Sequence, residues 1–227
     1  MQNLGIRVIF QGRNIQRLFQ GLITTSEIAL ISIIIGLALG IVTGIIRAAK
    51  SKSKSVCFIY RLYLELFRVI PILVWLFIVY FGIPFLFKIE LSGIVSSIIV
   101  FSLWGTAEMS DIVRGAVESL PKHQTESGKA IGLNNIQLYM YILIPQAVKR
   151  ILPGAINLAT RMVKTTSLVV LIGVIDVTKV GQQIIELSRL KVPTASFWVY
   201  GLIFFLYFII CYPLSRISKV LEQKWRS

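Results

Sequence analysis

Four ionisable residues lie within stretches of sequence that are otherwise apolar. Glu108 and Asp111 are one helical turn apart, and Arg161 and Lys164 have the same spacing further along the chain. Charged side chains in such stretches are costly and by default indicate a functional site. A zwitterion would suit them, with Lys164 meeting a carboxylate and Glu108 or Asp111 meeting an ammonium group. Two alternatives remain open: these charges neutralise one another, or Asp111 and Arg114 lie at the inner membrane interface.

No catalytic or cofactor motif accompanies these charges. His123 is the only histidine, and the two cysteines, Cys57 and Cys211, lack metal-ligand spacing. The sequence contains no Gly-x-Ser-x-Gly, no His-Glu-x-x-His and no phosphate-binding Gly-x-x-x-x-Gly-Lys-Ser/Thr sequence. We therefore expect no catalytic residue, no metal and no cofactor. Any ATP-driven work must come from a partner subunit.

Composition places the chain in a membrane. Of its 227 residues, 56% are hydrophobic and only 15% are charged, which is far from the average of soluble proteins. A net charge of +14 would suit nucleic acid in a soluble domain, but basic residues between apolar stretches are typical of cytoplasmic anchors. We expect one membrane domain over residues 1–227, in contact with lipid and with no nucleic-acid partner.

Five apolar stretches are long enough to cross a bilayer as helices, which takes about 20 residues. They are Gly21 to Ile46, Leu62 to Phe87, Leu91 to Arg114, Ile142 to Ile175, and Val192 to Ser215.

The fourth stretch differs from the others because it opens near Pro145 and Pro153 and carries Arg161 and Lys164 in its middle. It predicts a broken or kinked helix whose polar part faces other protein.

Glycines recur at every fourth position of the first stretch, at Gly36, Gly40 and Gly44. This spacing lets another helix approach closely. Packing within the chain is the simpler interpretation, and a dedicated dimer face is the alternative.

Basic residues predict the orientation of the chain. They crowd the first loop, the third loop and the C-terminal tail, which we assign to the cytoplasm. Five spans then leave the N-terminus outside and the C-terminus inside. Arg7, Arg13 and Arg17 conflict with that assignment, and residues 1–19 are a candidate interfacial amphipathic helix.

The third loop, residues 122–145, is polar and glycine-containing. Gln124 to Ile131 can form two helical turns, and Gly132 suits a left-handed stop. Asn134 or Asn135 can then cap a second helix. The pattern predicts a helix, a sharp turn and another helix, offered to a soluble partner.

The same loop resembles the cytoplasmic signature of permease subunits of ATP-binding-cassette importers, which reads Glu-Ala-Ala, three residues, Gly, nine residues, Ile-x-Leu-Pro. Glu126 and Gly132 have the right spacing, and Ile142, Ile144 and Pro145 fall at its end. The resemblance implies that an ATPase subunit grips the loop. Glu126 would orient the coupling helix and Gly132 would allow the sharp turn, while Ile131 and Leu133 would supply apolar contact.

Four further blocks are similar to the polar amino acid branch of that family: residues 65–74, 80–84, 111–116 and 164–168. The resemblance implies an all-α, five-span permease of the type I importer fold in the cytoplasmic (inner or plasma) membrane. Two permease subunits, identical or homologous, would pair with two copies of an ATP-binding subunit. An extracytoplasmic binding protein would deliver the amino acid, and alternating access would move it.

The resemblance and the intramembrane charges together predict a substrate pathway. It is lined by Arg68, Ile70, Pro71, Trp75, Glu108, Asp111, Arg161, Lys164, Thr165 and Ser167. The chain departs from the branch here: Val69-Ile70 replaces Gly-Thr, Trp75 replaces Gln, Glu108 replaces Tyr and Thr165 replaces an acid. These departures make the lining of the predicted substrate pathway bulkier and more apolar.

Two other classes of protein remain as alternatives. An ion-coupled secondary transporter would need its own coupling site and often a repeated half. A non-transporting membrane assembly subunit would keep the spans but would need no midplane charges.

Overall fold

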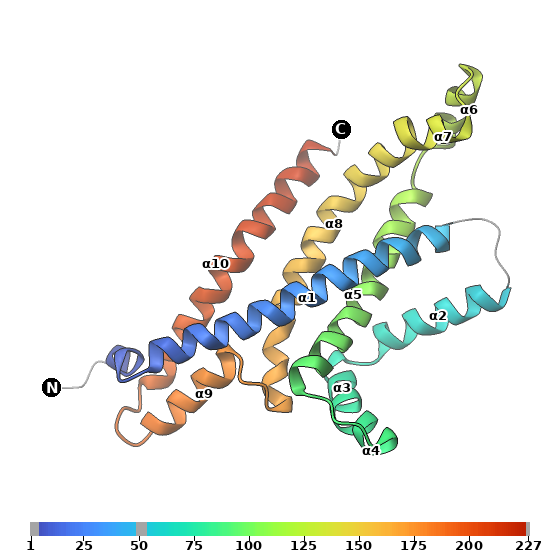
Figure 1. The fold of residues 1–227 in the computed structure, drawn as a ribbon. Coiled ribbons are helices and arrows are strands. Elements are labelled where there is room, and N and C mark those ends of the chain that lie inside the picture. The colour runs from blue at the N-terminus through green and yellow to red at the C-terminus, as the bar shows by residue number, and fades with distance from the viewer. Residues whose placement is uncertain (1–4, 49–53, 226–227) are drawn as a thin grey trace. The chain divides into compact units, whose positions relative to one another are not determined.

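The computed structural model describes residues 5–48 and 54–225, and in that part of the chain the ordered elements are all helical (Figure 1). They are η1 (Gly5–Phe10), α1 (Asn14–Ala48), α2 (Lys54–Val69), α3 (Ile72–Phe77), η2 (Ile78–Gly82), α4 (Ile83–Phe87), α5 (Gly93–Glu118), α6 (Lys122–Ala130), α7 (Asn135–Leu138), η3 (Tyr139–Leu143), α8 (Ile144–Thr165), η4 (Thr166–Ile172), α9 (Val177–Ser188) and α10 (Ala195–Lys224).

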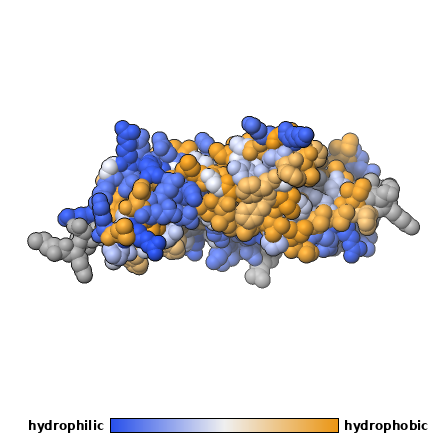
Figure 2. Space-filling model, turned by 90° about the horizontal axis from the view of Figure 1, so that it is seen from below, coloured by the Kyte–Doolittle hydropathy of each residue, from blue (hydrophilic) through white to orange (hydrophobic). Residues whose placement is uncertain are grey.

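Among the described residues, four helical stretches are long and apolar enough to cross a membrane, and a bent pair of helices makes a fifth when it is counted as one span. The four are α1, α5, the stretch Asn135–Ile172 and α10, and the pair is Phe58–Val69 with Ile72–Phe87. The predicted all-α class with five spans is confirmed. Much of the face in Figure 2 is apolar, in keeping with the many large hydrophobic side chains that α1, α2 and α10 expose.

The interruption lies in the second span, whereas the sequence predicted it in the fourth. Pro71 has no N–H to donate and disfavours the helical conformation at Ile70, so α2 ends before it. Pro145 and Pro153 instead lie within the continuous helical stretch Asn135–Ile172. Its winding changes to a wide π turn, Tyr139–Leu143, directly before Pro145, where the missing N–H removes one helical hydrogen bond.

The described residues form two compact units. The first comprises residues 5–32, 71–101 and 161–213, and the second comprises residues 33–48, 54–70, 102–160 and 214–225.

In the first unit, α9 is enclosed by η1, the start of α1 and the start of α10. Its core includes Val177, Val180 and Ile184, all at most 2% exposed. Gly181 allows close contact with α10, because a Cβ there would collide with Ile203. The segment predicted as an interfacial helix, residues 1–19, forms η1 and the first turn of α1 where it is described.

In the second unit, the glycine repeat of α1 packs against α5. A Cβ on Gly44 would lie 2.6 Å from Val113 Cβ, and one on Gly36 would lie 3.2 Å from Gly105 Cα. These glycines therefore serve contact between α1 and α5, which is the simpler of the two interpretations of the repeat.

Candidate functional site

The loop between α5 and α8 folds into two short helices joined by a tight turn. Gly132 has a φ of +85°, a left-handed conformation that glycine adopts without strain. Its N–H donates to Lys129 O at 3.0 Å, and Leu133 N–H donates to Gly128 O at 3.1 Å. These two bonds are the Schellman arrangement that ends a helix, so α6 stops where its sequence predicts.

A capping box starts the second helix of this loop. Asn134 Oδ1 accepts from the Gln137 N–H at 2.9 Å, and Gln137 Oε1 accepts from the Asn134 N–H at 3.0 Å. Asn134 rather than Asn135 is therefore the N-cap of α7. A Cβ on the buried Gly128 would lie 2.5 Å from Leu138 Cδ1, so α6 and α7 approach closely because residue 128 has no side chain.

Hydrogen bonds anchor the base of the loop to α8. Arg150 Nη1 donates to Ser119 O at 2.7 Å and to Ser119 Oγ at 2.6 Å. Gln146 Nε2 donates to Gln124 Oε1 at 3.2 Å. A displacement of the loop would therefore be passed to α8.

The outer face of the loop exposes apolar side chains. Ile131 is 76% exposed, Glu126 is also exposed, and Leu133 is half-buried beside Gly128. Ile136, which is equally exposed at 76%, was missed by the sequence interpretation. An apolar residue directly after an N-cap asparagine pair was the available signal.

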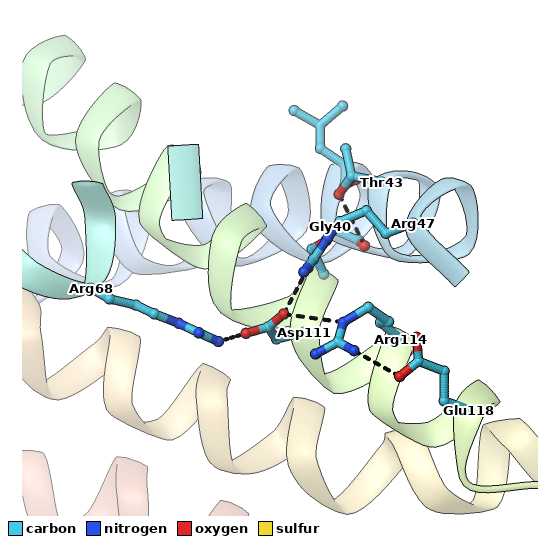
Figure 3. Close-up of polar contacts among 9 residues, drawn as sticks. Gly40, Thr43, Arg47, Arg68, Asp111, Arg114 and Glu118 are labelled. Atoms are coloured by element: carbon cyan, nitrogen blue, oxygen red, sulfur yellow. Dashed lines mark hydrogen bonds and ion pairs between the residues drawn. The ribbon is translucent and has the colours of Figure 1, made fainter. Parts of the chain in front are cut away.

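A cluster of charged residues surrounds Asp111, whose side chain is only 16% exposed (Figure 3). Arg47 Nη1 on α1 lies 2.7 Å from Asp111 Oδ1, and Arg68 Nη2 on α2 pairs with Oδ2. Arg114 Nε lies 3.7 Å from Oδ1 and its Nη1 lies 2.7 Å from Glu118 Oε2. One carboxylate thus joins α1, α2 and α5 in the second unit.

This cluster changes the interpretation of the intramembrane charges. The sequence placed Arg68 and Asp111 in one pathway, and the structure brings them into direct contact. Arg47 is not among the predicted pathway residues. It directly follows the first apolar stretch, in the first of the basic loops that we assign to the cytoplasm, where a basic residue is typical of a membrane anchor. Its role as a partner of Asp111 depends on α1 packing against α5.

The other predicted pathway residues are spread over several elements. They are Ile70 and Pro71 between α2 and α3, half-buried Trp75 on α3, half-buried Glu108 on α5, exposed Arg161 and Lys164 and half-buried Thr165 on α8, and half-buried Ser167 in η4. The two hydroxyls bond to backbone carbonyls of α8: Thr165 Oγ1 donates to Arg161 O at 2.8 Å and Ser167 Oγ donates to Lys164 O at 2.9 Å.

A buried carboxyl at the start of α9 was also missed. Asp176 directly follows the fourth apolar stretch, where the sequence predicts a connecting loop. Asp176 is fully buried, and its Oδ1 accepts from the Lys179 N–H at 2.8 Å as the N-cap of α9. Gly21 allows α1 to approach, since a Cβ there would lie 2.8 Å from Val177 N. Burial raises the pKa of the Asp176 carboxyl, against the effect of its backbone hydrogen bonds.

Three comparisons with known proteins agree with this architecture. A family model described as a binding-protein-dependent transport system inner membrane component matches residues 36–227. The L-cystine transport system permease protein TcyB of Bacillus subtilis is 31% identical over 206 residues, covering 90% of this chain and 84% of the relative. The arginine transport system permease protein ArtQ of the same organism is 30% identical, covering 92% and 93%. A putative glutamine transport system permease protein, GlnP of Rickettsia conorii, is 27% identical, covering 90% and 91%.

Solved structures show the same fold. An amino acid ABC transporter with histidines matches with a TM-score of 0.81 and 24% identity, over 93% of this chain and 95% of that one. The MetNI methionine ABC transporter in an inward-facing form matches with a TM-score of 0.71 and 17% identity, over 91% and 96%. The predicted fold is confirmed by these likenesses, and the predicted family by the model that spans most of the chain. The chain belongs to the family of inner-membrane components of binding-protein-dependent transport systems.

Proposed function

We propose that this chain is the non-catalytic permease subunit of an ABC importer that carries a polar amino acid by alternating access. The observation that carries the proposal is the loop at residues 122–145, a closely packed helical turn with an exposed apolar face. The named transport of glutamine, cystine and arginine by relatives supports an amino acid as the substrate class.

The loop supplies what a coupling element needs. The left-handed turn at Gly132 and the capping box at Asn134 hold its shape, and Arg150 ties its base to α8. Exposed Ile131 and Ile136 provide apolar contact for an ATPase subunit. When ATP binding closes a pair of ATPases, the loop would move as a lever. The pathway through the permease pair would then close to one side of the membrane and open to the other.

Orientation and partners follow from this role. The coupling loop and the C-terminal tail lie in the cytoplasm and the N-terminus lies outside. A second permease subunit, two ATP-binding subunits and an extracytoplasmic binding protein complete the importer.

The proposed substrate pathway includes the residues that the sequence predicts. Glu108 or Asp111 would meet a substrate ammonium group, and Asp111 is in addition paired with Arg47, Arg68 and Arg114. Lys164, exposed on α8, would meet the carboxylate. Glu108→Gln and Lys164→Met should each change substrate stimulation of the partner's ATPase more than subunit assembly, and unchanged stimulation would contradict this assignment.

Gly132→Arg tests the coupling role. The substitution strains a left-handed turn and adds a long cation to the exposed face, while no atom lies within 4 Å of the new Cβ. We expect the ATPase subunit to stop copurifying while membrane insertion stays normal. Gly12→Arg is the matched control, because Gly12 has a φ of +55° and equally open space. Normal copurification with Gly132→Arg would contradict the loop assignment.

A further inference from the structure

A basic cavity of about 280 Å³ lies in the second unit. Its charged lining consists of Arg47, Arg61, Arg68, Arg114, Glu65 and Asp111. The lining thus carries four guanidinium groups and two carboxylates. Glu118, which lies outside the lining, pairs with Arg114. Four positive and three negative charges leave one excess positive charge.

The ion pairs do not use all of the guanidinium donors. Both hydrogen bonds that the described residues provide for Arg47 use Nη1, one to Ser110 Oγ at 3.0 Å and one to Asp111 Oδ1 at 2.7 Å. A guanidinium carries five N–H donors, and only 14% of the Arg47 side chain is exposed. Arg68, in contrast, has half of its side chain exposed, and Arg61 is exposed on α2. The cavity therefore presents arginine donors to a further acceptor.

The cavity suits a small, singly charged oxyanion. Its volume is far above the roughly 10–15 Å³ that one water needs. Forked guanidinium donors match phosphate oxygens in geometry and form charge-assisted hydrogen bonds with them. Tyr60, which also borders the cavity, adds a phenolic hydroxyl that can donate. A phosphodiester, with one negative charge, would balance the excess charge of the lining.

The surface beside the cavity distinguishes a lipid from a free ion. Phe58, Leu62, Leu66 and Val69 recur at helical spacing on α2 and are all exposed. On the helix, this apolar stripe adjoins the face that carries Arg61 and Glu65, which border the cavity. Acyl chains would lie on such a stripe when the headgroup enters the cavity, whereas inorganic phosphate would gain nothing from it.

We propose that the cavity between α1, α2 and α5 binds the phosphodiester headgroup of an anionic phospholipid. Basic pockets between membrane helices are suited to such headgroups. Arg47, Arg61 and Arg68 hold the phosphate, and Asp111 keeps Arg47 and Arg68 in place. The site shares Arg68 and Asp111 with the proposed substrate pathway, but the binding of a lipid headgroup is a separate property that goes beyond the proposed transport and does not depend on it.

Native mass spectrometry of the full chain in detergent tests this site with three probes: phosphatidylglycerol, zwitterionic phosphatidylcholine and inorganic phosphate. We expect phosphatidylglycerol to bind roughly tenfold more tightly than phosphatidylcholine, and inorganic phosphate not to displace it at equal concentration. Arg61→Gln should weaken phosphatidylglycerol binding about fivefold. Arg61 is exposed, so the fold should survive its loss.

Arg216→Gln is the matched control, since Arg216 is also exposed and lies on α10 away from the cavity lining. Its binding of phosphatidylglycerol should equal that of the unmodified chain. Equal losses in the two variants, or equal binding of the two lipids, would overturn the site. Full displacement by inorganic phosphate would overturn its assignment to a lipid.

Discussion

Gly132→Ala adds a single methyl group to the turn, and the free-energy cost of this change follows from the local structure. Gly132→Ala places no atom in contact, because nothing lies within 4 Å of the new Cβ. What remains is the φ of +85°, and a left-handed conformation costs a residue with a Cβ about 1–2 kcal/mol. If the ATPase recognises only the ordered loop, its apparent affinity for the permease should fall roughly 5- to 30-fold.

The assay is a titration of the purified cognate ATPase subunit against the permease in nanodiscs, with the dissociation constant as readout. Gly132→Asn should recover most of the affinity, since asparagine tolerates the left-handed region. Gly173→Ala is the matched control: its φ is +81° with equally open space, but it lies between η4 and α9. It should leave the dissociation constant unchanged. Unchanged affinity in Gly132→Ala, or an asparagine variant as weak as the alanine variant, would refute the reasoning.

Three further predictions concern stability, measured by unfolding in detergent micelles. Asp176→Asn keeps the N-cap acceptor but cannot ionise. Because burial raises the folded-state pKa of this carboxyl, the folded protein holds the proton more tightly than the unfolded chain. The original protein should therefore lose stability as pH rises above about 3.9 and through the raised pKa. The Asp176→Asn variant should not lose this stability. If the stability of the two proteins depended on pH in the same way, the prediction would be contradicted. Asp111→Asn should destabilise the fold by about 3 kcal/mol, because it leaves Arg47 mostly buried without its partner. Adding Arg47→Gln should recover part of that loss, and simple additivity of the two changes would count against the ion pair. Gly40→Val should destabilise by about 1–3 kcal/mol, because a Cβ there collides with Met109; an unaltered unfolding midpoint would show that α1 and α5 do not pack closely there.

Local chemistry was the most predictable part of the fold. The five spans follow from apolar length alone, and the stop at Gly132 and the cap at Asn134 depend only on neighbouring residues. The interruption was less predictable, because Pro71, Pro145 and Pro153 all remove a helical hydrogen bond. Which of them ends a helix depends on packing and on winding changes such as the π turn before Pro145.

The Asp111 cluster shows where sequence alone fails. Arg47 and Asp111 are distant in sequence and meet because the glycine repeat brings α1 against α5. The sequence showed both the repeat and the charges, but not the register between the two helices. Asp176 was missed for a related reason: a carboxyl in a connecting loop is expected to be solvated, and its burial depends on the neighbouring elements that cover it.

Uptake by proteoliposomes is the most direct test of the central claim. They would contain this chain, its ATPase partner and the extracytoplasmic binding protein, with a radiolabelled amino acid that the binding protein retains. We expect the uptake to require ATP on the side of the membrane that the coupling loop faces. The uptake should persist when ion gradients are dissipated. Uptake driven by an ion gradient without ATP would contradict the account and favour a secondary transporter, and no uptake in a fully assembled complex would favour a non-transporting assembly subunit.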